Sequence, residues 1–287
     1  MTRLRYVFDE ARVQRFIAEG RGQGLGADFS PWLQIQDVPS SGRSHRPYGI
    51  KSRRVHHLLS DGEWKCFLKF EGAQDVVEIQ EQFPLDRMET FRIARRLGFK
   101  HPRTLDGTPY VMTLDFLVTT TGPAGSWKVP YTFKYDPETL TPREQELMDI
   151  TREFCRSNGM ELQVLDQRFF NEPFNINYDS VRAYHDISQL AFYDQTDIAG
   201  ITQAMSSEIA GGSGDTLLRA CRWLAGSFDT TPLVVYQVAM HMVSRGVLRV
   251  DLSSTVGLER LPLSAYSLGT PPALPVNRPV FRGGRLV

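Results

Sequence analysis

The chain has 287 residues, of which 41% are hydrophobic, so it is long enough to form two domains with a core in each. Lysine plus arginine (33) equals aspartate plus glutamate (33), which excludes a global positive field that would draw the whole molecule to nucleic acid. Any affinity for DNA must therefore come from local clusters of charge or from a partner.

The cysteines and the absence of long apolar runs indicate the compartment in which we expect the protein. Cys66, Cys155 and Cys221 are odd in number and far apart, so we expect neither a disulfide framework nor a zinc knuckle. Residues 1–19 are charged throughout, and no run of about 18 apolar residues occurs, so we expect no signal peptide and no membrane span. A cytoplasmic protein with reduced thiols is the expectation.

The N-terminal part of the chain leads to a basic segment. Residues 8–18 have helical spacing, and the four glycines within residues 20–26 predict a flexible loop that faces DNA or a partner. Residues 40–57 then form one dense basic stretch without an acid. We expect its side chains to hold DNA backbone phosphates, and the alternative is a solvated surface loop. The expected DNA contacts are Arg43, His45, Arg46, Lys51, Arg53, Arg54 and His56.

An α/β pattern follows the basic segment. The spacing of apolar residues predicts, in chain order, a helix over residues 60–71, a strand over 76–83, a basic helix over 91–97, strands over 110–119 and 129–135, a helix over 142–158 and a strand over 160–166. We therefore expect an α/β domain over residues 1–168, with its acidic positions on the central hairpin.

The pattern becomes mainly helical after about residue 169. Residues 171–178 look like a polar loop, after which the spacing predicts helices over 184–193, 198–209, 216–225 and 232–244 and a strand over 247–252. Two helices and a strand at the end of a small domain indicate a winged-helix-like domain over residues 169–270. Residues 271–287 are rich in Pro, Gly and Arg and are expected to form a flexible tail until a partner binds.

Three charged residues stand out inside the α/β pattern. Glu63 lies at the start of a predicted helix, Asp115 lies in an otherwise apolar strand, and Lys134 lies in the partner strand. Each also has a structural interpretation: Glu63 completes a capping box with Ser60, Asp115 forms a salt bridge, and Lys134 is exposed. An unpaired carboxylate in a buried strand costs roughly several kcal/mol, however, which favours a metal ligand at Asp115.

Together these residues predict a restriction-endonuclease-like core of the PD-(D/E)xK type. Glu63 and Asp115 would bind one or two Mg²⁺ ions, because hard oxygen ligands without clustered His or Cys argue against zinc, and Mn²⁺ could substitute. The metal would polarise the scissile phosphate, and Lys134 would position the attacking water. The predicted activity is metal-dependent hydrolysis of DNA.

The residues around these positions resemble the TnsA family, the endonuclease subunit of the heteromeric transposase of Tn-seven-like transposons. The similarity extends from about residue 19 to residue 118, and the matching segments are residues 19–24, 31–33, 38–46, 54–61, 81–85, 100–102 and 115–118. The resemblance implies a restriction-endonuclease-like catalytic domain followed by a winged-helix-like domain. It also implies cleavage of the 5′ strands at transposon ends, beside a TnsB-like DDE transposase and a TnsC-like AAA+ regulator.

The resemblance also implies roles for particular residues. The metal-binding glutamate, the strand aspartate and the lysine of the family match Glu63, Asp115 and Lys134. The family has a glutamine two residues before the lysine, where this chain has Thr132, which could bind the metal through its hydroxyl or leave coordination to a backbone carbonyl. A further family acid aligns with Thr151, for which the nearby Asp149 could substitute.

Three other functions stay open on sequence alone. A catalytically weak adaptor could link the transposase to the AAA+ regulator, although retention of Glu63, Asp115 and Lys134 argues against it. A stand-alone site-specific nuclease is disfavoured by the neutral net charge. A winged-helix regulator with a vestigial core would bind DNA through residues after about 169 without Mg²⁺.

Overall fold

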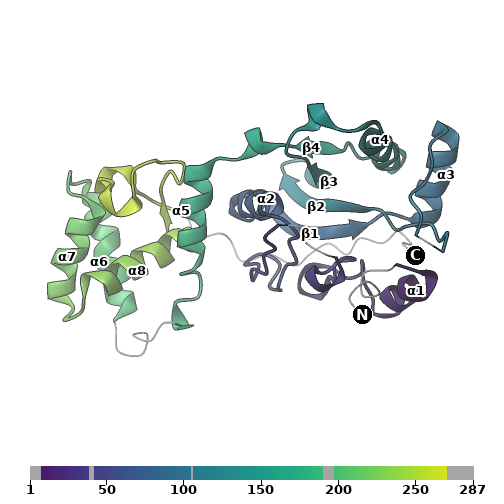
Figure 1. Cartoon of the computed structure of the whole chain (residues 1–287). Coiled ribbons are helices and arrows are strands. Elements are labelled where there is room, and N and C mark those ends of the chain that lie inside the picture. The colour runs from purple at the N-terminus through teal and green to yellow at the C-terminus, as the bar shows by residue number, and fades with distance from the viewer. Residues whose placement is uncertain (1–7, 39–41, 105, 190–196, 270–287) are drawn as a thin grey trace. The chain divides into compact units, whose positions relative to one another are not determined.

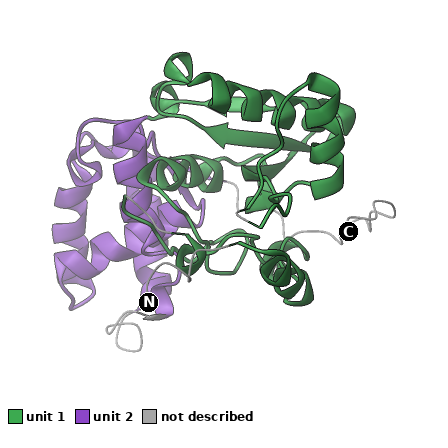
Figure 2. Ribbon diagram, turned by 45° about the vertical axis from the view of Figure 1, so that its right-hand side comes forward, with its two compact units in different colours: residues 1–170, 284–287 green, residues 171–283 purple. Residues whose placement is uncertain are grey.

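The computed structural model describes residues 8–38, 42–104, 106–189 and 197–269 (Figure 1). These residues form two compact units, and the second begins at Asn171 (Figure 2). The boundary predicted from the sequence lies two residues earlier, after residue 168. No helix among the described residues is both long and apolar enough to cross a membrane. The predicted tail over residues 271–287 lies outside the described residues.

A four-stranded sheet forms the centre of the first unit (Figure 1). Its strands, in the spatial order β1-β2-β3-β4, are β1 (Val76–Pro84), β2 (Thr113–Gly122), β3 (Gly125–Phe133) and β4 (Gln163–Leu165). β2 is antiparallel to both neighbours, and β4 pairs with β3 in parallel. Phe116 lies opposite Tyr131. This register brings the start of β2 beside the end of β3, so residues near Asp115 and Lys134 meet at one end of the sheet.

Helices cover both faces of the sheet. On one face, α2 (Asp61–Gly72) packs Phe67 and Phe70 against Phe116 and Val118. On the other face, α4 (Pro142–Ser157), with α3 (Arg87–Leu97) beside it, contributes a second apolar cluster. Each fully buried side chain of this size contributes about 1.5–3 kcal/mol, so the two clusters hold the sheet rigidly between its helices.

The first turn of α2 lies directly on β3. Ser60 is the N-cap residue, and its side chain accepts a hydrogen bond from the Glu63 amide at 3.1 Å. A Cβ atom added at Gly62 would lie 2.2 Å from the Phe133 ring, so only glycine permits this approach. The close contact places Glu63 against the sheet.

The glycine-rich loop after α1 (Glu10–Ala18) is not the flexible loop that the sequence predicted. Gly22 has a φ of +76°, and a Cβ atom there would lie 2.2 Å from the Pro84 ring of β1. The Gly26 amide donates a hydrogen bond to the Glu78 carboxylate at 2.6 Å. The glycines therefore let the loop pack closely on β1.

The second unit is mainly helical around one apolar core. Its helices are α5 (Glu172–Arg182), α6 (Ile198–Gly211), α7 (Leu217–Ser227) and α8 (Pro232–Ser244). Two short strands, β5 (Leu248–Arg249) and β6 (Ser267–Leu268), pair after them in antiparallel fashion. The strand predicted over residues 247–252 is thus shorter than expected, and the winged-helix character of this unit stays a prediction.

The predicted polar loop over residues 171–178 was wrong, because these residues form most of α5. Asn171 is the N-cap, with its side chain accepting from the Phe174 amide at 3.1 Å, and Pro173 lies in the first turn, where its fixed φ suits a helix. The helix expected over residues 184–193 is replaced by a short 3₁₀ turn at Ile187–Gln189. Residues 190–193 lie outside the described residues.

Candidate active site

Asp115 is fixed by the end of the neighbouring strand. Its Oδ2 atom accepts hydrogen bonds from the Thr132 hydroxyl at 2.8 Å and from the Phe133 amide at 2.6 Å. Among the described residues, no donor bonds its other oxygen, Oδ1. β2 and β3 therefore orient this carboxylate and leave one oxygen for a ligand.

Glu63 comes to the same region from the start of α2. Its side chain is buried at 7% exposure, and its Oε2 atom accepts from the Leu59 amide at 2.8 Å. The capping interpretation is therefore half right: Ser60 caps the helix, whereas the Glu63 carboxylate bonds the Leu59 amide rather than the Ser60 amide of a capping box.

The two carboxyl groups raise the free energy of each other's charged form. Burial, followed by repulsion from Asp115, raises the pKa of Glu63 to about 8. Burial also raises the pKa of Asp115, although the bonds from Phe133 and Thr132 and the charge of Lys134 oppose the increase. A bound cation would remove this repulsion and let both carboxylates ionise at neutral pH.

Lys134 directly follows β3. Its backbone amide donates to the Leu165 carbonyl at 2.8 Å, which extends the pairing of β3 with β4 by one residue. Its ammonium charge lowers the pKa of Asp115 and, after two hydrogen bonds from Thr141, that of Glu144 in the first turn of α4. The predicted lysine therefore lies within electrostatic reach of Asp115.

Gln82 is a further residue of this site that the sequence analysis missed. It is buried, its Nε2 atom donates to Glu63 at 3.4 Å, and its Oε1 atom accepts from the Thr113 hydroxyl at 3.2 Å. Its φ of +47° is rare for a residue other than glycine and costs about 1 kcal/mol or more. The available sequence signal was three consecutive polar residues, 80–82, in a strand that reads as buried.

The acid expected from the following helix is absent from the site. Asp149 pairs with Arg152 at 3.0 Å on α4, and the Thr151 hydroxyl donates to the Leu147 carbonyl of the same helix at 2.9 Å. Across the described part of the chain, no three side chains of the types His, Cys, Asp and Glu gather as metal ligands. The donor set is therefore two carboxylates, Glu63 and Asp115, with Thr132 beside them.

Part of the basic segment serves the fold rather than a ligand. Arg54 and His56 are buried at 8% and 0% exposure, and both bind the fully buried Glu81 of β1. The Lys51 ammonium donates to the carbonyls of Ala73 and Val76. The predicted DNA contacts do not fit these three side chains, because Arg54 and His56 are buried and Lys51 is held by backbone carbonyls.

The remaining residues of the basic segment reach the surface. Arg43, Arg46 and Arg53 are exposed. His45 is partly exposed, and its ring bonds the Asp61 carboxylate at 2.6 Å and stacks on Trp64. The segment is a narrow antiparallel loop, anchored by its inward side chains, that presents the three arginines to solvent. Arg43 lies near the start of α2, where its guanidinium is 4.0 Å from the Asp61 carboxylate.

The mixed sheet carries two carboxylates and a lysine at one end, an arrangement consistent with an endonuclease-like domain, and comparison with known families agrees. Residues 73–167 match the family described as TnsA-like endonuclease N terminal, a range that contains Asp115, Thr132 and Lys134. Over 118 residues the chain is 52% identical to the Transposon Tn7 transposition protein TnsA of Escherichia coli. Both matches agree with the resemblance to the TnsA family that the motifs predicted. The aligned part covers 41% of this chain and 43% of that relative, less than half of either.

Proposed function

We propose that this chain is the metal-dependent DNA endonuclease subunit of a cut-and-paste transposase, and that it cleaves the 5′ strands at transposon ends. The observation that carries this proposal is the pair formed by the buried Glu63 and the partly buried Asp115, with the charge of Lys134 acting on Asp115. Two carboxyl groups that repel each other lower the free energy of unfolding at neutral pH, so a purely structural role does not account for the pair.

The donor set fits a hard divalent cation. Glu63 and Asp115 would hold Mg²⁺ through carboxylate oxygens, with Thr132 as a third oxygen donor. When bound there, Mg²⁺, or Mn²⁺ in its place, would supply polarisation of the scissile phosphate and a lower pKa for the attacking water. Because the Thr132 hydroxyl already donates to Asp115, we propose that its main role is to orient that carboxylate.

The protein's own side chains supply the remaining chemistry. The hydrogen bonds from Thr132 and Phe133 fix Asp115 before substrate arrives. Gln82 holds the Glu63 carboxylate from the side of β1. Lys134 would donate a hydrogen bond to the attacking water and offset the negative charge that develops on the phosphorus oxygens.

The exposed arginines at 43, 46 and 53 are the proposed contacts to the DNA backbone. Three phosphate contacts would give modest affinity, which fits a subunit that acts with a partner. The relative's name, a transposition protein of transposon Tn7, supports a partner from the transposition machinery, and we propose a TnsB-like DDE transposase. We place contact with a TnsC-like AAA+ regulator on the C-terminal part of the chain.

The test is cleavage of a labelled transposon-end duplex in the presence of the partner transposase. Wild type should nick the 5′ strand in Mg²⁺ or Mn²⁺ but not in EDTA, and Asp115→Asn should remove the nick while keeping the circular dichroism spectrum of the wild type. Asp75→Asn is the matched control, because Asp75 is exposed just before β1, where its carbonyl accepts from Thr121 near the hairpin end of the sheet. Normal 3′-strand joining without any 5′ nick by wild type would instead identify an adaptor subunit.

A further inference from the structure

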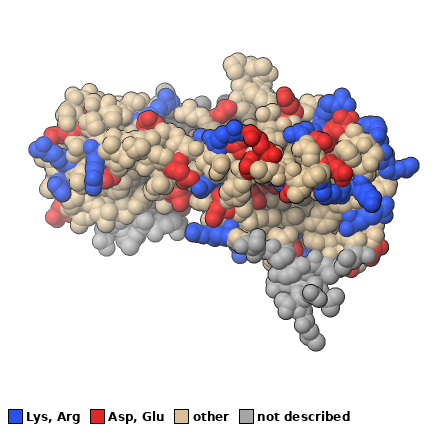
Figure 3. Space-filling view, turned by 45° about the horizontal axis from the view of Figure 1, so that its top comes forward, with Lys and Arg blue, Asp and Glu red and all other residues tan. Residues whose placement is uncertain are grey.

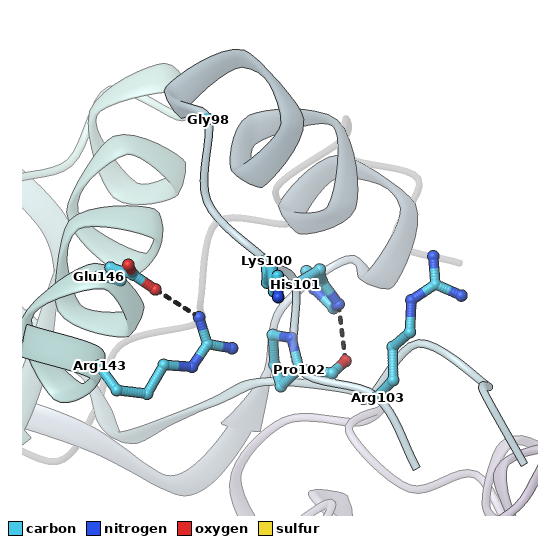
Figure 4. Close-up of a pocket in the computed structure, with 7 residues that line it drawn as sticks. All are labelled: Gly98, Lys100, His101, Pro102, Arg103, Arg143 and Glu146. Atoms are coloured by element: carbon cyan, nitrogen blue, oxygen red, sulfur yellow. Dashed lines mark hydrogen bonds and ion pairs between the residues drawn. The ribbon is translucent and has the colours of Figure 1, made fainter. Parts of the chain in front are cut away.

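A basic hollow lies between the end of α3 and the start of α4 (Figure 4). Its volume is about 680 Å³, and its lining includes three cationic residues and one carboxylate. The lining residues are Gly98, Lys100, His101, Pro102, Arg103, Arg143 and Glu146. Lysine and arginine side chains also gather on the surface at the α3 end of the first unit (Figure 3). The lining of the hollow itself has more positive than negative side chains.

The walls of the hollow are built rigidly. The His101 ring bonds the Pro102 carbonyl at 2.9 Å and the Thr90 hydroxyl at 3.1 Å, and burial lowers its pKa, so the ring is a neutral wall. Arg103 donates to the Gly107 carbonyl at 2.9 Å, and its side chain extends away from Arg143 (Figure 4). The available positive charge therefore comes from Lys100, which is exposed, and from Arg143.

Arg143 is held by a carboxylate that an anion could displace. Its guanidinium binds Glu146 at 2.6 Å, and the two side chains are 42% and 37% exposed. An ion pair this exposed contributes at most about 1 kcal/mol, so a phosphate entering the hollow could take over the guanidinium at little cost. A guanidinium matches the two oxygens of a phosphate, and an ammonium adds compact charge beside it.

The hollow lies at the same end of the sheet as the candidate active site. Lys100 belongs to the segment between α3 and β2, which begins at Thr113, and Arg143 lies in the first turn of α4, the next α-helix after β3. The charge of Lys134 acts on Glu144, the neighbour of Arg143 in sequence. A DNA strand with its scissile phosphate at Asp115 could therefore continue toward the hollow.

We propose that Lys100 and Arg143 bind a backbone phosphate of the DNA duplex next to the scissile phosphate. This inference rests on the proposed DNA cleavage, since it extends the same substrate along the protein surface. The contact would set the position of the strand and would be insensitive to base sequence.

The experiment measures binding of the full chain to a fluorescent duplex by anisotropy, in EDTA, over a range of salt concentrations. Each phosphate contact contributes about 0.9 to the slope of log affinity against log salt. The double variant of Lys100→Ala and Arg143→Ala should therefore lower the slope by about that amount, and each single variant by a part of it. Lys128→Ala is the matched control: it is exposed on β3, about 20 Å of strand before Lys134, and should leave the slope unchanged.

A fourth variant separates phosphate binding from a structural role. Glu146→Gln frees Arg143 and removes the only carboxylate of the hollow, so it should strengthen DNA binding, whereas loss of a merely structural ion pair would not. Unchanged salt slopes for Lys100→Ala and Arg143→Ala would overturn the proposal. A decrease of the slope for Lys128→Ala as large as theirs would also overturn it. Loss of transposase association with intact DNA affinity would also overturn it, in favour of an acidic protein partner. Failure of the proposed function would be recognised separately: wild type would then show no metal-dependent nick, whatever the salt dependence of DNA binding.

Discussion

Replacing Glu81 by glutamine should destabilise the first unit strongly. The Glu81 side chain has no exposed surface and accepts two hydrogen bonds from Arg54, at 2.8 and 2.5 Å, one from the His56 ring at 2.7 Å and one from the His57 amide at 3.0 Å. Glutamine removes the charge and turns an NH₂ group toward these donors. Because Arg54 would stay charged and buried, we expect a loss of about 3–5 kcal/mol in the free energy of unfolding.

Denaturation followed by tryptophan fluorescence can isolate the first unit. Trp223 lies in the second unit, so in a Trp223→Phe background the remaining tryptophans, Trp32, Trp64 and Trp127, all report on the first. The midpoint for Glu81→Gln should fall well below that of the parent. A difference under about 1 kcal/mol at pH 7 would refute the reasoning, since it would mean that the charge of Arg54 is satisfied in another way.

The effect should depend on pH in a defined direction. Burial by itself would raise the pKa of Glu81, but the charge of His56 and the hydrogen bonds of Arg54 and His56 outweigh it and hold the pKa below its ordinary value of 4.5. A depressed pKa stabilises the fold above the unfolded-state pKa, and this contribution is lost as the pH falls through the folded-state value. The difference between parent and variant should therefore shrink below about pH 4.5, and a constant difference would contradict the assignment.

Two further predictions concern the start of α2. Because the pKa of Glu63 is raised to about 8, its contribution to stability is full below its ordinary pKa of 4.5 and is lost as the pH rises toward 8. Without metal, Glu63→Gln should therefore have a larger free energy of unfolding than wild type at pH 8. Mg²⁺ should stabilise wild type but not the variant. Equal denaturation curves at pH 8 would contradict the raised pKa of Glu63. Gly62→Ala should lose about 1–3 kcal/mol and slow cleavage, because its methyl group would meet the Phe133 ring at 2.2 Å. In the same denaturation assay the control Gly226→Ala, which has open space inside α7, should gain up to about 1 kcal/mol, and a stable Gly62→Ala would mean that the helix start can shift freely.

The sequence predicted the features that depend on neighbouring residues. The cap at Ser60, the approximate strands around Asp115 and the helix at Pro232–Ser244 follow from local spacing and cap chemistry. The polar composition of residues 171–178 predicted a loop instead of α5, because asparagine and proline are common in loops, although Asn171 and Pro173 begin this helix. Local composition alone does not distinguish these two uses.

The features that the sequence did not predict depend on distant partners. The partner of Arg54 is Glu81, 27 positions away, so nothing within the basic segment reveals that Arg54 faces inward. The left-handed conformation of Gln82 likewise depends on Trp32, Glu63 and Thr113, which come from separate parts of the chain. Pairing along β1 has to be known before either contact can be inferred.

β1 contacts both the segment proposed to bind DNA and the candidate active site. Glu81 anchors the segment that carries the exposed arginines, and the next residue, Gln82, touches Glu63. One peptide bond therefore joins the two attachments, with no hinge between them. If the arginines bind DNA as proposed, the distance between the phosphates that they bind and the phosphate that is cleaved would be constant. Changing the position of the cut would then require rebuilding β1 itself rather than exchanging a surface loop.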